Sequence, residues 1–156
     1  MTEASMLAVK LKSEGVKVVQ LFEGLADDQW TIEIYSEDEK WTVRNILFHL
    51  MTSERAFVKL FEAIRKGGTG VTEDFVIDRY NARQQEKTKQ LSPSDLLTNY
   101  KSARKEMVVW VSEIQDADLE KIGRHPYLGR TTLREMIKMV YIHNQVHYRD
   151  LRKILR

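Results

Sequence analysis

Apolar residues recur at three- and four-residue spacing through four long stretches of the chain, the periodicity of helices with one buried face. These stretches cover about residues 3–25, 42–65, 92–114 and 132–154. No alternating strand pattern persists between them, although "TIEIY" at residues 31–35 could form a short extended piece. Only two prolines and seven glycines interrupt the chain. The pattern therefore predicts an all-α fold, a bundle of four helices.

Capping residues mark where three of these helices begin. Thr42 and Thr132 precede apolar runs as N-caps, and Thr132 opens a capping-box sequence. Ser92 is followed by Pro93, which the first position of a helix tolerates. The glycines of "KGGTG" end the second helix, and a less regular segment, about residues 78–87, predicts a short helix before the third.

The length and composition are those of one globular domain spanning residues 1–156. Apolar residues make up 42% of the chain and charged residues 31%. No stretch approaches the roughly 20 continuous apolar residues of a membrane span. Lys and Glu interrupt the apolar residues near the N-terminus, so we expect no signal peptide and a cytoplasmic location.

The charges exclude some partners and limit the possible metal chemistry. The 25 basic and 23 acidic residues are interspersed, so a nucleic-acid partner is not expected. We interpret Arg149, Arg152, Lys153 and Arg156 as cations that oppose the dipole at a helix C-terminus, rather than as a phosphate site. Because the chain has no cysteine, any transition-metal site must use imidazole and carboxylate groups.

The segment "HNQVHYRD" places His143 and His147 four residues apart, on one face of the fourth helix. His147 lies within the apolar stripe of that helix and His143 at its edge, so both face the interior or a groove. A buried histidine is more often a hydrogen-bonded core residue than a ligand. Without a third ligand, the pair fits packing and metal binding about equally well.

His49 is the candidate third ligand, because metal sites in bundles are assembled from side chains on facing helices. It lies on the flank of the apolar stripe of the second helix, beside Ile46 and Ser53. Glu54 lies within the stripe, where it could accept a hydrogen bond from a ligating imidazole or a neighbouring arginine, or bend out to solvent. His125 precedes Pro126 in a loop, and we interpret it as a turn residue.

Three segments together resemble the DinB/YfiT-like family of metal-binding four-helix proteins. They are "WTVRNILFHLMTSE", "DRYNARQ" and "HPYLGRTTLREMIKMVYIHNQVHYRDLRKIL", in the same order and spacing. The resemblance covers nearly the whole chain and implies an up-down-down-up or related topology. It also implies one divalent ion, zinc or nickel, bound by His49, His143 and His147. Asn81 lies in the second segment, and we assign it no role.

Three histidines leave at least one position on such an ion open, the pattern of a catalytic site. A water there could act in hydrolysis, with Glu54 as a general base, and a thiol could be held as thiolate. The resemblance implies both thiol-dependent transferases or isomerases and hydrolases. We favour a thiol-dependent transferase or isomerase that acts on a small molecule, with a low-molecular-weight thiol as cosubstrate because the chain lacks cysteine.

Two alternatives remain open from the sequence. One is a hydrolase that uses a metal-bound water. The other is a non-catalytic, metal-stabilised module for binding or dimerisation, in which Trp30, Trp110 or Tyr141 could contribute to the contact of a homodimer.

Overall fold

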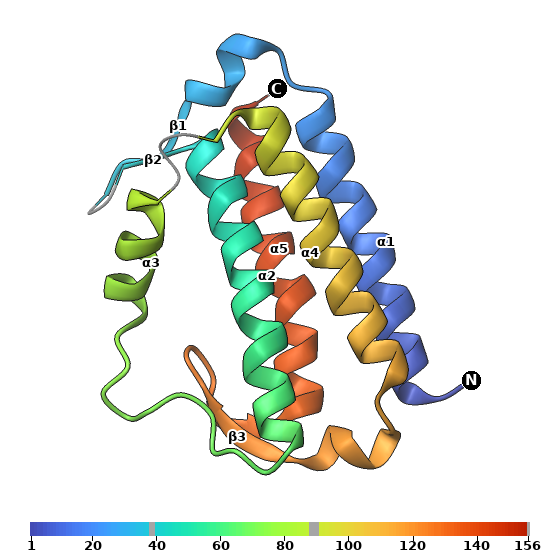
Figure 1. Cartoon of the computed structure of the whole chain (residues 1–156). Coiled ribbons are helices and arrows are strands. Elements are labelled where there is room, and N and C mark those ends of the chain that lie inside the picture. Colours follow the sequence, from blue (N-terminus) through green and yellow to red (C-terminus); the bar gives the residue numbers. More distant parts are fainter. Residues whose placement is uncertain (38–39, 88–90, 156) are drawn as a thin grey trace.

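Four long helices form the bundle in the computed structural model, which describes residues 1–37, 40–87 and 91–155. They are α1 (Glu3–Glu23), α2 (Val43–Arg65), α4 (Pro93–Glu113) and α5 (Leu133–Ile154). Figure 1 shows that α1 and α5 run in one direction and α2 and α4 in the other. The predicted four-helix bundle and its up-down-down-up order are therefore confirmed.

The helices begin where their caps predict. The side-chain oxygens of three residues accept a hydrogen bond from the backbone N–H three residues further on: Thr42 at 3.4 Å, Ser92 at 3.1 Å and Thr132 at 3.3 Å. These bonds satisfy N–H groups that the first turn of a helix otherwise leaves without a partner. Thr2 caps α1 in the same way at 3.0 Å.

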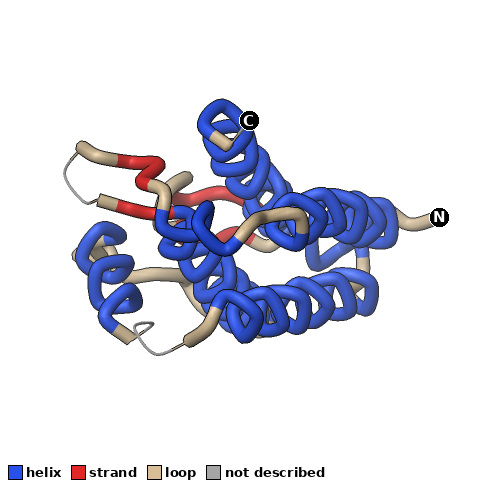
Figure 2. Tube along the Cα trace, turned by 90° about the horizontal axis from the view of Figure 1, so that it is seen from above, coloured by secondary structure: helices blue, strands red, loops and turns tan. Residues whose placement is uncertain are grey.

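Shorter elements fill the connections. The 3-10 helices η1 (Asp27–Thr31) and η2 (Asp116–Glu120) follow α1 and α4, and α3 (Ile77–Glu86) lies between α2 and α4. The extended piece expected near "TIEIY" is β1 (Glu33–Tyr35), which pairs with β2 (Trp41–Thr42). Both α3 and this strand pair lie to the left of the bundle in Figures 1 and 2.

A second strand pair, β3 (Ile122–His125) with β4 (Gly129–Thr132), was not predicted. The buried positions of β3 are Gly123 and His125, while Ile122 is exposed. Buried and more exposed residues therefore alternate along β3, as in a strand. Because the buried residues are a glycine and a histidine, the alternation does not appear in the pattern of hydrophobic residues. Gly70, after α2, bridges to Arg124 and has a φ of 93°. A Cβ there would lie 2.3 Å from the Arg124 nitrogen, so this close approach requires glycine.

Two clusters of buried apolar side chains form the core, one towards each end of the bundle. Along every long helix a buried polar residue lies between the positions of the two clusters. These are Glu14 in α1, Ser53 and Glu54 in α2, Arg104 in α4 and Asn144 in α5. The bundle therefore has a polar layer at mid-height, and its members need partners within the protein.

Glu54 has such a partner in Arg104, and both side chains are almost fully buried. Arg104 Nε donates to the two carboxylate oxygens of Glu54 at 3.0 and 3.1 Å, and its Nη1 donates to the Leu11 carbonyl at 2.7 Å. The arginine thus links α1, α2 and α4. A Cβ on Gly15 would lie 2.8 Å from Arg104 Cγ, so glycine leaves the room that this side chain needs.

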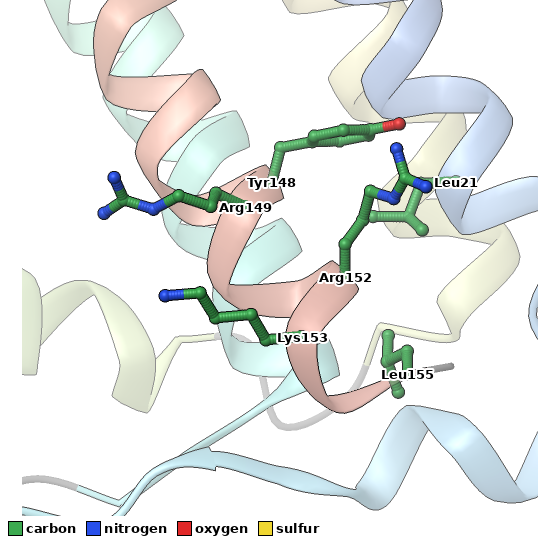
Figure 3. Close-up of a pocket in the computed structure, with 6 residues that line it drawn as sticks. All are labelled: Leu21, Tyr148, Arg149, Arg152, Lys153 and Leu155. Carbon is green, nitrogen blue, oxygen red and sulfur yellow. The ribbon is translucent and has the colours of Figure 1, made fainter.

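Basic residues at the end of α5 surround a hollow of about 480 Å³, drawn in Figure 3. Arg149 and Lys153 point to one side of the helix, whereas Arg152 extends to the other. The guanidinium carbon of Arg152 lies 5.7 Å from the centre of the Tyr148 ring. Because these cations do not converge on one point, the structure favours a role at the helix C-terminus over a phosphate site. Arg156 lies outside the described residues.

The described helices do not meet the requirements of a membrane span. None of them combines the length and the hydrophobicity that a crossing needs.

Replacing Glu54 with leucine should reduce the free energy of unfolding by about 3–5 kcal/mol, because Arg104 would stay buried without its counter-charge. The double variant Glu54→Leu/Arg104→Met should recover much of this loss. Urea denaturation measures both. The exposed pair Glu23–Lys101 is the control, and its Lys101→Met variant should lose less than about 1 kcal/mol. A double variant as unstable as the single one would contradict this role for the pair.

Candidate metal centre

Three of the four histidines meet between α2 and α5. His143 Nε2 lies 3.0 Å from His49 Nε2 and 3.0 Å from His147 Nε2. The candidate ligand atoms all lie within 4.8 Å of one another. The antiparallel neighbours α2 and α5 supply this arrangement: one turn separates His143 from His147, and His49 faces them from the other helix. The structure therefore brings together the three histidines that the sequence selects.

The spacing of these nitrogens suits a shared ion. Zinc lies 2.0–2.1 Å from an imidazole nitrogen, so two such ligands with bond angles of about 90–110° are roughly 2.8–3.4 Å apart. The two short distances at His143 agree with that range. A set of three imidazoles without a thiolate also suits zinc or nickel. The residues present therefore fit a divalent transition-metal ion.

Burial keeps these imidazoles neutral. Loss of solvation lowers the pKa of His143 to about 3 and the pKa of His147 to about 4. The pKa of His49 is also well below its ordinary value, through burial first and through the two neighbouring histidines second. Because only a neutral imidazole can donate a nitrogen lone pair to a metal, the site is prepared for an ion at neutral pH.

A tyrosine and a carboxylate determine which nitrogen of His147 carries the proton. Tyr35, at the end of β1, donates its hydroxyl proton to Asp150 Oδ2 at 2.6 Å. Burial and this carboxylate raise the pKa of Tyr35, so the phenol stays protonated. Its oxygen therefore accepts the Nδ1–H of His147 at 2.9 Å. That bond leaves the Nε2 lone pair of His147 facing the other two histidines.

His49 is held between its own helix and the first strand pair. The Trp41 ring, from β2, lies 4.9 Å from the His49 ring, centre to centre. Ser53, one turn further along α2, has its hydroxyl 3.5 Å from His49 Nδ1, at the limit of a hydrogen bond. The imidazole is thus oriented mainly by packing against the indole.

A cleft of about 660 Å³ lies over the histidines. Its other walls come from three separate parts of the chain. They are Tyr35, Glu37 and Trp41 around the first strand pair, Asp78 and Asn81 from α3, and Tyr127 from the turn of the second. A volume of this size is typical of sites for small molecules.

A smaller apolar pocket of about 200 Å³ adjoins this cleft. Phe57, Phe75 and Pro126 contribute to its walls, and it shares Asn81 and Tyr127 with the cleft. Asn81, to which the sequence analysis assigned no role, therefore stands where the polar cleft and the apolar pocket meet.

Glu54 does not belong to this centre. The sequence allows an imidazole, an arginine or solvent as the hydrogen-bond partner of Glu54. The structure shows the arginine, because Arg104 binds both carboxylate oxygens of Glu54. Glu54 is also not among the residues that line the cleft over the histidines. The general-base and imidazole-binding roles expected for Glu54 are thus corrected to a structural role in the polar layer.

His125 shapes the turn that carries Tyr127. Its Nδ1 accepts the backbone N–H groups of Tyr127 at 3.0 Å and Leu128 at 3.2 Å, as expected of a turn residue. The ring stacks on Phe57, and burial lowers the pKa of His125 to about 4. Its Nε2 is buried and has no hydrogen-bond partner among the described residues.

Sequence reasoning missed the groups that orient the histidines and line the cleft. Asp150 follows His147 by three residues, a spacing that places it near the same helix face, and this was the one available signal. Tyr35 is 112 residues from His147 in the chain, and no helical pattern links the two. Tyr127 lies in a hairpin that was expected to be a loop.

Comparisons with known proteins agree with this fold. Residues 11–151 match the model of the DinB superfamily. The structure is similar to YfiT from Bacillus subtilis, described as a probable metal-dependent hydrolase with an unusual four-helix bundle topology. The identity is 17%, the match covers 98% of this chain and 87% of YfiT, and the TM-score is 0.79.

Two further solved structures show the same likeness. The mycothiol-dependent maleylpyruvate isomerase is 14% identical, with a TM-score of 0.75, over 96% of this chain but 59% of that enzyme. The colibactin self-resistance protein ClbS, solved in complex with double-stranded DNA, is 15% identical, with a TM-score of 0.75, over 100% of this chain and 99% of ClbS. No curated protein matches the sequence. At these identities the likeness shows the fold alone.

The Tyr35→Phe variant should bind zinc about 10-fold more weakly, because His147 Nδ1–H loses its acceptor and the ring loses its anchor. Competition against a chromophoric chelator measures this affinity. Tyr127→Phe is the matched control. The hydroxyl of Tyr127 lies in the same cleft but makes no hydrogen bond to a histidine among the described residues, so this variant should bind zinc like the wild type. Equal affinity of Tyr35→Phe and wild type would contradict the orienting role.

Proposed function

Because the chain belongs to the DinB superfamily, we propose that it is an enzyme that uses one divalent metal ion, zinc or nickel, to act on a small molecule. The observation that carries this proposal is the convergence of three neutral imidazoles at the base of a cleft. The described metal dependence of YfiT supports it. His49, His143 and His147 are the proposed ligands.

The bound ion would supply an open coordination position that lowers the pKa of a thiol or a water. The protein's own groups do the remaining work. Tyr35 and Asp150 hold the lone pair of His147 in place. Trp41 packs over His49, and Tyr127 approaches His143 with 5.7 Å between ring centres. These rings limit the access of bulk water to the ligands.

Within this class we favour a transferase or isomerase that takes a low-molecular-weight thiol as cosubstrate. The similar isomerase is described as mycothiol-dependent, and this chain offers no thiol of its own. The cleft is open enough to admit both a thiol and a small electrophile. A cytoplasmic location, which we also propose, would keep such thiols reduced.

A hydrolase is the second candidate, favoured by the description of YfiT. Hydrolysis would need a general base, and Glu54 is held by Arg104 while Asp150 accepts the Tyr35 hydroxyl. The general base expected from the sequence is therefore engaged, which is why we rank this route second.

A homodimer is proposed for this protein, and DNA binding is not. Trp30 is buried in the core, and the Trp110 indole donates to Glu62 at 2.8 Å, so two of the three aromatic residues considered for a dimer contact are used within the chain. The homodimer stays a prediction. We do not extend the DNA partner of ClbS to this protein, because its charges are nearly balanced and interspersed.

Turnover should require both metal and thiol. We would assay zinc- or nickel-loaded protein on electrophilic aromatic, maleyl-type and ester substrates, with and without bacillithiol, mycothiol, glutathione or cysteine. The expected result is product formation that depends on one of the thiols and is lost with the metal in His49→Ala, whose metal content is measured in parallel. His125→Gln changes the histidine outside the centre and should keep its metal. Metal-dependent turnover that ignores every thiol would instead favour the hydrolase.

A further inference from the structure

The charges around the cleft are all of one sign. Glu37 and Asp78 line it, and no lysine or arginine does so among the described lining residues. Neither carboxylate has an ion-pair partner within the parts of the chain that the structure covers. Away from the metal position, an anionic group of a ligand would therefore meet two uncompensated negative charges at the entrance, whereas a cationic group would be attracted.

Asp78 shares the α3 wall of the cleft with a second polar residue. Asp78 and Asn81 lie one turn apart on α3, so both face the same direction. The Asn81 side chain lies close to the hydroxyl of Tyr127, and the Asp78 carboxylate is close enough to act on that hydroxyl electrostatically. Asp78 is thus placed at the cleft by α3, near the turn that carries Tyr127.

Aromatic rings complete this environment. Tyr35, Trp41 and Tyr127 line the same cleft, and the faces of such rings attract cations. A site that combines an unpaired carboxylate with several aromatic rings and no basic group is suited to an organic ammonium group.

We propose that the cleft selects a thiol cosubstrate that carries a protonated amine, with Asp78 as the counter-ion of that amine. The aromatic walls contribute to the same preference, and Glu37 adds to the negative potential at the entrance. The amine preference rests on the proposed function, because the sulfur of the thiol has to be anchored at the three histidines.

Three small thiols of similar size test this preference. Cysteamine carries a positive charge, 2-mercaptoethanol is neutral and mercaptoacetate carries a negative charge. Their dissociation constants from cobalt-loaded protein can be read from the thiolate-to-cobalt absorbance, so no turnover is needed. Wild type is compared with Asp78→Asn and with Asp74→Asn, which removes the same charge from an exposed position outside the cleft.

Asp78→Asn should weaken cysteamine binding about three- to tenfold relative to its effect on 2-mercaptoethanol, and should strengthen mercaptoacetate binding. Asp74→Asn should change neither ratio. The three thiols differ in thiol pKa and in how they chelate cobalt, but the substitution alters neither property. These differences therefore cancel when the ratio of two thiols' dissociation constants is compared between variant and wild type. The effect should also shrink as salt is added, because the site is open to solvent.

The outcomes separate this preference from the function on which it rests. If the loaded wild type binds the thiols but Asp78→Asn shifts all three equally, or none of them, the amine preference is wrong and the thiol function stands. If the loaded wild type binds no thiol, the thiol function is contradicted and the amine preference with it. A shift of equal size in Asp74→Asn would also overturn the role of Asp78.

Discussion

The burial of three neutral imidazoles between α2 and α5 is the constraint on which the rest of the site depends. Their Nε2 atoms approach to 3.0 Å in two pairs, and burial holds their pKa values far below neutrality. Nitrogen lone pairs directed at one point repel one another. Protonating one of the rings would reduce this repulsion, but burial disfavours the charged imidazolium. A divalent ion would relieve the repulsion without requiring a protonated ring. The hydrogen bond from His147 to Tyr35 serves the same end, because it fixes the proton on the far side of the ring.

The topology that brings the histidines together also builds the cleft. Since α2 and α4 run in parallel, their connection must return along the length of the bundle, and α3 lies on this return path (Figure 1). It brings Asp78 and Asn81 to the cleft, opposite a turn that His125 shapes. Below the site, the buried pair of Glu54 and Arg104 ties three helices together. The three histidines thus stand on long helices, whereas the walls come from shorter elements.

The sequence was sufficient to predict the features that depend on helical periodicity. Helix positions, the caps at Thr42, Ser92 and Thr132, and the inward faces of the histidines all follow from local spacing. The convergence of His49 with the pair on α5 needed one further assumption, that α2 and α5 are neighbours, which the family resemblance supported.

Other features depend on contacts between distant residues, and local patterns do not encode them. The hairpin was missed because Gly123 and His125 occupy its buried positions. A buried carboxylate at position 54 demands a partner, but only the packing of α4 against α2 identifies it as Arg104. The link from Asp150 through Tyr35 to His147 joins a helix to a strand more than a hundred residues away.

Diffraction from crystals of zinc-loaded protein, recorded at the zinc absorption edge, tests the central claim most directly. A single strong anomalous peak about 2.0–2.1 Å from the Nε2 atoms of His49, His143 and His147 is the predicted result. A peak bound only by the carboxylates of Glu37 and Asp78, or no peak in crystals that retain the fold, would contradict the claim that these histidines form a metal centre.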